Sequence, residues 1–197
     1  MPHIHTAVGQ LDFTVSAYIL RQEKGSWKCM LHAHRKFQTL MQIGGHVELS
    51  QQPWEAMAAE VLEESGYSLD ELEVLQWQEP PTLDSAAVIH PIPFSMNTHD
   101  VGDDHYHIDI SYAFVATDLP RQVVGKDESE DIRWLTLEES QALVTSGEAL
   151  RDTISLYEYL LRHLETLHKV PATSFSIEKP AATTVSYKVG KASDSRT

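Results

Sequence analysis

The chain divides into short apolar segments whose periodicity predicts a mixture of strands and helices. Runs rich in β-branched and aromatic residues, bounded by turn-forming residues, predict strands at 13–20, 27–34, 40–47, 73–79, 86–94, 106–117 and 132–135. Apolar residues at helical spacing predict helices at 53–65 and 152–169, and a capping-box sequence at 136–139 opens another helix. This order of elements predicts an α/β fold, with helices packed on both faces of a mixed sheet.

The segment 53–65 has well-marked helix ends and two distinct faces. Pro53 suits the first helical position, where its missing N–H costs nothing, and Gly66 suits the left-handed residue that ends a helix. With a rotation of about 100° per residue, the apolar and acidic residues fall in separate arcs. The apolar arc holds Trp54, Ala58 and Val61, and the acidic arc holds Glu60, Glu63 and Glu64. We therefore expect one face to be buried and the other to carry chemistry.

The acidic face predicts a site for a divalent metal ion. Glu60, Glu63 and Glu64 stand at i, i+3 and i+4, so a helix places their carboxylates in one patch. Like charges at this spacing repel one another by about 0.2–0.5 kcal/mol per pair on an exposed helix. A bound cation would relieve that repulsion, and carboxylate oxygens favour Mg²⁺ or Mn²⁺ over Zn²⁺. An ordinary solvated acidic helix face is the alternative interpretation.

The segment from Gly45 to Tyr67 resembles the Nudix box, written G-x5-E-x7-R-E-U-x-E-E-x-G-U, where U is a bulky aliphatic residue. The matching residues are Gly45, Glu60, Val61, Glu63, Glu64 and Gly66. The departures are Gln51 in place of the first Glu, Ala59 in place of the Arg, and Tyr67 in place of the last aliphatic residue.

The resemblance implies a Nudix-type α/β/α sandwich around a mixed β-sheet. It also implies a metal-dependent pyrophosphohydrolase that cleaves a nucleoside diphosphate linked to another group. Glu60, Glu63 and Glu64 would bind Mg²⁺, or Mn²⁺ in its place, with the Gly45 carbonyl as a further ligand, and Glu63 and Glu64 would serve catalysis. Glu128 lies where some family members supply a base or an extra metal ligand, although a solvated acidic loop is the alternative for it.

The neutral residues Gln51 and Ala59 leave a second function open. Removal of one member of a buried ion pair can cost about 3–5 kcal/mol, whereas both positions are neutral in this chain. We interpret them as a joint change that keeps the fold and weakens the order of the active site. The alternative to a hydrolase is therefore a Nudix-fold sensor that binds a nucleotide or metabolite and hydrolyses little or none of it.

Charge restricts the class of partner. The formal net charge of −14 disfavours broad binding to nucleic acids or acidic membranes. A small phosphorylated substrate must therefore be received by local positive charge. Arg35 and Lys36, shortly before Gly44 and Gly45, are candidates for phosphate contact, and a solvated turn is an equally good interpretation of them.

A second constellation lies in the predicted strand 106–117 and just before it. His105, His107 and Asp109 alternate along the chain and share one face of a strand. They are similar to part of the H-x-H-x-D-H signature of zinc-binding metallo-β-lactamase-type hydrolases, but Ile110 replaces its last histidine. We expect His107 and Asp109 to line the substrate cleft or to form a hydrogen-bonded pair, and a purely structural role is the alternative.

Length and composition indicate one domain followed by a tail. The 197 residues, 42% of them hydrophobic, suffice for one domain at residues 1–170. Residues 171–197 are rich in Ala, Ser, Thr, Lys and Pro and predict a flexible tail. We expect a cytoplasmic protein, because the sequence shows no cleavable leader and no apolar run long enough to cross a bilayer. The single cysteine, Cys29, suits a small buried side chain, and a homodimer is compatible with the sequence.

Overall fold

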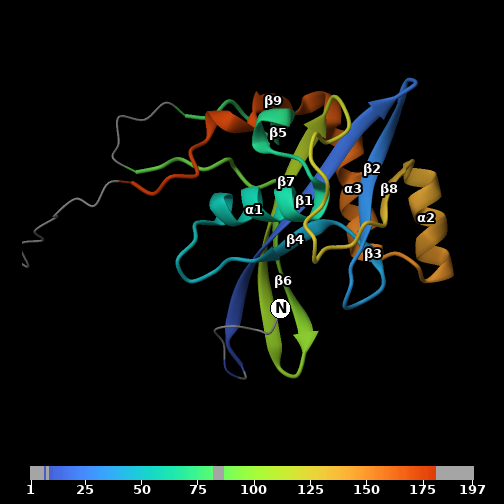
Figure 1. Cartoon of the computed structure of the whole chain (residues 1–197), viewed down its shortest axis with the longest axis horizontal. Coiled ribbons are helices and arrows are strands. Elements are labelled where there is room, and N and C mark those ends of the chain that lie inside the picture. The colour runs from blue at the N-terminus through green and yellow to red at the C-terminus, as the bar shows by residue number, and fades with distance from the viewer. Residues whose placement is uncertain (1–6, 8, 82–86, 181–197) are drawn as a thin grey trace, which may run out of the picture.

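A mixed β-sheet lies between helices in this computed structural model, which describes residues 7, 9–81 and 87–180 (Figure 1). Within these residues the strands follow the order β3-β2-β1-β7-β5-β9, and β4 pairs with β1, β6 with β7 and β8 with β2. The strand pair β1 and β7 is parallel, and the other pairs are antiparallel. The strands are β1 (Leu11–Glu23), β2 (Ser26–Ala33), β3 (Leu40–Met41), β4 (Ile43–His46), β5 (Leu72–Gln76), β6 (Ser95–Gly102), β7 (His105–Ala116), β8 (Ile132–Leu135) and β9 (His168–Pro171).

Helices cover both faces of this sheet, as the alternation of residues in β1 requires. Val15 and Ile19 belong to the apolar core that includes Trp54 of α1 (Pro53–Ser65). Tyr18 and Leu20 point to the opposite face, into the core formed with α3 (Arg151–His163), and α2 (Leu137–Ser146) packs beside α3. The predicted α/β/α sandwich around a mixed sheet is therefore confirmed.

Two helix starts follow the sequence signals closely. Helix α1 begins at Pro53 and ends at Ser65, and Gly66 adopts the left-handed conformation with φ of 76°. At the start of α2, the Thr136 hydroxyl accepts a hydrogen bond from the Glu139 backbone N–H at 3.2 Å. The Glu139 carboxylate in turn accepts from the Thr136 backbone N–H at 2.6 Å, which completes the predicted capping box.

The prediction of a strand at 86–94 is wrong, because residues 87–94 form no strand in the structure; residue 86 lies outside the described residues. Pro91 and Pro93 interrupt this stretch, and proline has no N–H to donate to a sheet ladder. Instead, the buried Gln76 side chain bonds Ile92 in both directions, donating to its carbonyl at 3.2 Å and accepting from its N–H at 2.8 Å. The strand that pairs with β7 at this edge is β6, which begins at Ser95.

The segment predicted as one helix at 152–169 ends earlier than expected. Helix α3 stops at His163, a 3₁₀ turn follows at Leu164–Thr166, and β9 then pairs antiparallel with β5, with Val170 opposite Val74. The packed part of the chain also extends beyond residue 170. Phe175 is buried, and its carbonyl accepts a hydrogen bond from the Trp54 indole N–H at 3.2 Å. Residues 181–197 of the predicted tail lie outside the described part of the chain.

The apolar stretch at 40–47 forms two strands instead of one. Met41 of β3 pairs with His32 of β2, whereas His46 of β4 pairs with Thr14 of β1. The chain therefore changes its partner strand just before Gly44 and Gly45, the glycine pair. Cys29 is buried as predicted, and none of the helices formed by the described residues is long and apolar enough to cross a membrane.

Candidate active site

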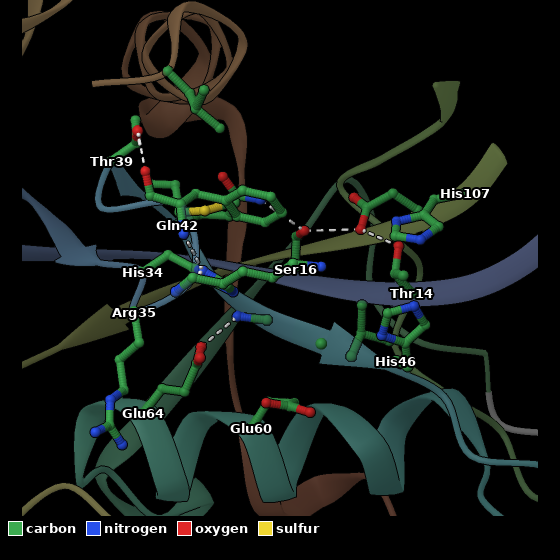
Figure 2. A pocket seen from close by; sticks show the side chains of 18 of the residues that line it. Thr14, Ser16, His34, Arg35, Thr39, Gln42, His46, Glu60, Glu64 and His107 are labelled. Atoms are coloured by element: carbon green, nitrogen blue, oxygen red, sulfur yellow. Dashed lines mark hydrogen bonds between the residues drawn. The ribbon is translucent and has the colours of Figure 1, made fainter. Parts of the chain in front are cut away.

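A cavity of about 690 Å³ opens where α1, β1, β4 and the loop before β8 meet (Figure 2). It brings together almost all of the side chains that the sequence singled out. The predicted site residues that line it are Arg35, Lys36, Gly45, Glu60, Glu64, His107, Asp109 and Glu128. Glu63 is exposed on α1 and does not line the cavity in this arrangement.

Glu64 and Asp109 are the two buried acidic residues of the cavity, and Glu64 has 5% of its surface exposed. Its Oε2 accepts a hydrogen bond from the Gly44 backbone N–H at 2.9 Å and lies 3.7 Å from Nε2 of His32. Burial raises the pKa of the Glu64 carboxyl to about 8, against the lowering effect of the Gly44 N–H and with further raising by the other carboxylates of the site. Burial also lowers the pKa of His32 to about 4, so this imidazole supplies no positive charge near neutral pH.

Glu60 lies one helical turn from Glu64 and presses against the glycine pair. A Cβ added to Gly45 would stand 2.1 Å from Oε1 of Glu60, so only glycine leaves room for this carboxylate. Burial raises the pKa of Glu60 to about 7, and the negative charges of Glu63 and Glu128 raise it further. In Figure 2, Glu60 and Glu64 both project from α1 toward the strands.

These carboxylates fit a divalent cation in both chemistry and electrostatics. Burial and neighbouring carboxylates disfavour the charged forms of Glu60 and Glu64, and a bound cation would favour those charged forms. Their oxygens are hard donors of the kind that Mg²⁺ prefers. Within the described residues, the ligand atoms of Glu60, Glu63 and Glu64 do not all lie within 4.8 Å of one another.

The loop between β7 and β8 is hydrogen-bonded to the C-terminal end of α1, and these bonds position Glu128. The Gly125 N–H donates to the Glu63 carbonyl at 2.6 Å, and the Glu128 N–H donates to the Gly125 carbonyl at 2.9 Å. The Arg35 guanidinium donates to the Asp127 carbonyl beside them. Arg35 therefore has a positioning role in the structure in addition to lining the cavity.

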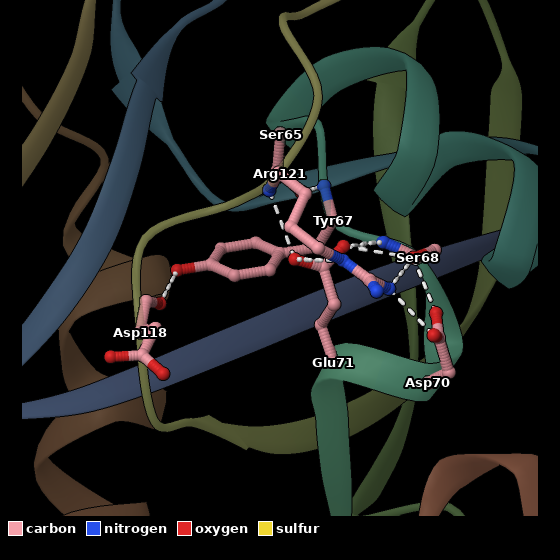
Figure 3. A network of polar contacts seen from close by, with 7 residues as sticks. All are labelled: Ser65, Tyr67, Ser68, Asp70, Glu71, Asp118 and Arg121. Atoms are coloured by element: carbon pink, nitrogen blue, oxygen red, sulfur yellow. Dashed lines mark hydrogen bonds and ion pairs between the residues drawn. The ribbon is translucent and has the colours of Figure 1, made fainter.

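A second set of contacts ties the start of this loop to the residues just after α1 (Figure 3). The buried Tyr67, which departs from the box pattern, donates its hydroxyl to the Asp118 carbonyl at 2.5 Å. Arg121 pairs with Asp70 at 2.6 Å and with Glu71 at 3.1 Å. Tyr67 thus keeps the apolar packing of an aliphatic residue and adds a polar attachment for the loop.

Asp109 is the centre of a buried hydrogen-bond network in the cavity wall. Its carboxylate accepts from the hydroxyls of Thr14 at 2.9 Å, Ser16 at 2.8 Å and Ser111 at 2.7 Å. Gln42 extends the network by donating to the Ser16 oxygen at 3.2 Å. The sequence reasoning missed Thr14, Ser16 and Gln42; the available signal was the small polar residues at alternate positions of an otherwise apolar strand.

Gln51 keeps a structural task in the loop before α1. Its side-chain oxygen accepts a hydrogen bond from the Glu48 N–H at 3.2 Å, and its own N–H donates to the Glu48 carbonyl at 2.8 Å. A neutral amide is sufficient for both contacts. The loop thus retains local order at this departure from the box pattern.

Comparison with known protein families decides the relationship of the chain. The family model of the NUDIX domain matches residues 11–155, which include the glycine pair, α1 and the loop that carries Glu128. The chain belongs to the Nudix family. By family it is a Nudix-type hydrolase, a class that acts on phosphoanhydride bonds. No curated protein matches the chain at a significant level.

Solved Nudix structures share this fold at low sequence identity. A NUDIX-family hydrolase from Clostridium perfringens is 23% identical with a TM-score of 0.61, covering 78% of this chain and 97% of its own. A binary complex of the Caenorhabditis elegans Ap4A hydrolase is 15% identical with a TM-score of 0.58, covering 78% and 98% respectively. The NUDIX domain of Shewanella oneidensis NrtR, complexed with ADP ribose, is 14% identical with a TM-score of 0.56, covering 83% and 93%. At these identities the similarity establishes the fold.

Proposed function

We propose that the chain is a Mg²⁺-dependent pyrophosphohydrolase whose substrate is a nucleoside diphosphate linked to another group, with Mn²⁺ as an alternative ion. The supporting observation is the pair Glu60 and Glu64, withdrawn from water in the wall of the cavity with raised pKa values. Glu60, Glu63 and Glu64 would hold the ion together with the Gly45 carbonyl. When bound, Mg²⁺ would neutralise phosphate charge and make a nearby water more acidic.

The other cavity residues would bind and orient the substrate. Arg35 and Lys36 supply local positive charge for phosphate oxygens in a chain of net charge −14. His107 would contact the substrate from the strand side, and Asp109 would act through the Thr14 and Ser16 hydroxyls that it orients. Glu128 faces the same cavity as Glu60 and is the candidate base, because its loop is fixed to the end of α1.

A substrate panel with matched variants tests this function. Nucleoside triphosphates, ADP-ribose, NADH, dinucleoside polyphosphates and nucleotide sugars are incubated with the full chain and Mg²⁺, and products are separated by chromatography. We expect cleavage of at least one panel member, and we expect Glu64→Gln to reduce kcat by about 100-fold or more, a loss typical of a residue that stabilises the transition state. The control is Glu138→Gln, an exposed glutamate in the first turn of α2, which should keep full activity.

A second candidate function is nucleotide or metabolite sensing with little hydrolysis. The neutral Gln51 and Ala59 favour it, and the NUDIX domain of NrtR, which resembles this fold, was solved in complex with ADP ribose. Calorimetry with the same panel separates the two functions. Micromolar binding of a panel member without product in the presence of Mg²⁺ and Mn²⁺ would favour the sensor, whereas turnover that Glu64→Gln removes would favour the hydrolase.

A further inference from the structure

A group of imidazoles and one carboxylate gathers on strands β1, β4 and β7, and two of its imidazoles line the cavity. The histidine cluster, as we name it, consists of Asp12, His46, His105 and His107. Strand register brings these residues together from positions far apart in the sequence: Asp12 lies opposite His107, and His46 lies opposite Thr14, two residues after Asp12. Residues two apart on one strand share a face, so all four side chains point the same way.

The distances within the histidine cluster match those between ligands of one metal ion. Nε2 of His105 lies 3.1 Å and Nε2 of His46 lies 3.9 Å from Oδ2 of Asp12. Ligand atoms of Asp12, His105 and His107 all lie within 4.8 Å of one another. Zinc bonds of about 2.0–2.1 Å in a tetrahedron separate neighbouring ligand atoms by about 3.3 Å. Small side-chain rotations would therefore bring these atoms onto one ion.

The donor set differs in kind from the glutamates of the box. Imidazole nitrogens suit zinc and related first-row ions, whereas Mg²⁺ prefers oxygen. The His107 ring centroid lies 4.8 Å from that of His46 and 5.2 Å from that of His105, so three imidazoles face one another. The buried Asp12 carboxylate also makes the cluster unsuitable for a phosphate anion.

We propose that Asp12, His46, His105 and His107 bind one transition-metal ion of the Zn²⁺ type, at a site separate from the glutamates of the Nudix box. His46 directly follows Gly45, so the ion would tie the entry of the box to strands β1 and β7. His46 and His107 stand side by side in Figure 2, with ring centroids 4.8 Å apart, and both line the cavity. The proposal does not depend on hydrolytic activity or on Mg²⁺ binding.

Zinc binding to the metal-free full chain tests the site directly. Calorimetry with a competing chelator measures stoichiometry and affinity, and X-ray absorption at the zinc edge identifies the ligands. We expect about one equivalent of zinc with scattering from at least two imidazoles. The double variant His105→Gln, His107→Gln should bind at least about 100-fold more weakly, because loss of even an outer-shell partner costs 10–100-fold. Control variant His168→Gln, a half-exposed histidine on β9, should bind like the wild type.

Further variants separate this site from other zinc ligands in the chain. The variant Glu60→Gln, Glu64→Gln should keep its zinc affinity, and Asp12→Asn provides a second test if the double histidine variant fails to fold by circular dichroism. Equal zinc affinity in the wild type and in every folded cluster variant would overturn the proposal. Oxygen-only scattering would also overturn it, as would loss of binding in the Glu60→Gln, Glu64→Gln variant. The sequence also carries His3 and His5 near its start, so loss of binding only in a His3→Gln, His5→Gln variant would overturn it too.

Discussion

Replacing Glu64 by glutamine should stabilise the metal-free protein at alkaline pH. The amide is almost isosteric with the carboxyl, and its oxygen can still accept the hydrogen bond from the Gly44 N–H. What the substitution removes is the negative charge of a side chain that is only 5% exposed. The variant therefore isolates the cost of ionising a buried carboxylate from the cost of lost packing.

The sign and size of the effect follow from the raised pKa. Because the folded-state pKa is about 8 and the ordinary value is 4.5, the folded chain holds the Glu64 proton more tightly than the unfolded chain does. The contribution of this group to stability is therefore complete below about pH 4.5 and is lost as pH rises through 8. Each tenfold change in proton affinity is worth about 1.4 kcal/mol, which sets an upper limit of about 5 kcal/mol. We expect about 1–3 kcal/mol at pH near 9, because the side chain can relax toward water in the cavity.

Urea unfolding at about pH 5 and about pH 9, with EDTA present, measures the difference. Glu64→Gln should be near-neutral at the acidic pH and should raise the free energy of unfolding at the alkaline pH. Control variant Glu63→Gln carries the same chemical change on an exposed side chain and should alter stability by less than about 0.5 kcal/mol. Adding Mg²⁺ at pH 9 should stabilise the wild type and have a smaller effect on Glu64→Gln. Equal destabilisation of Glu64→Gln at both pH values would refute the electrostatic reasoning.

Four other substitutions test particular contacts. Gly45→Ala should leave the fold intact but weaken Mg²⁺ binding, because the added Cβ meets the movable end of the Glu60 side chain. Gly44→Ala should instead lower the free energy of unfolding, because its Cβ would lie 2.1 Å from a backbone carbonyl of β1. Urea unfolding and Mg²⁺ titration of both variants test this, and identical behaviour of the two would disprove it. Phe175→Ala should cost about 3–5 kcal/mol of stability, since this ring is buried against the α1 indole, and a loss below 1 kcal/mol would show that residues after 170 do not belong to the core. Thr136→Ala should cost about 1 kcal/mol through loss of the α2 cap, as thermal unfolding can measure, while an unchanged midpoint would mean that the cap contributes nothing.

Much of the site could be predicted because its main signals are local. Helix α1 has the predicted bounds, since Pro53 and Gly66 act on the backbone at their own positions. Position 45 requires glycine because the Glu60 carboxylate of α1 occupies the space of a Cβ, and both residues belong to the Nudix box. The metal-binding and catalytic roles of the glutamates remain predictions for the experiments described above.

Other predictions failed where a local proline signal was overlooked or where the deciding contact is distant in sequence. The stretch at 86–94 has strand-forming residues, yet Pro91 and Pro93 exclude it from the ladder and the Gln76 side chain replaces the missing strand partner. The segment after His163 continues the apolar pattern of a helix, but pairing with β5 makes its last residues a strand. Neither Gln76 nor β5 can be recognised as a partner from local periodicity.

The sequence by itself determined the alternation of elements, the ends of α1, the acidic face of that helix and the Nudix family resemblance. These properties depend on residues within one element or within the continuous segment from Gly45 to Tyr67, so spacing along the chain is enough to reveal them. Tertiary structure alone decided which acidic groups are buried, how Arg35 and Tyr67 hold the loop with Glu128, and how strand register gathers Asp12 with three histidines. Burial and cross-strand register arise from packing between segments up to about one hundred residues apart, and no local pattern contains that information.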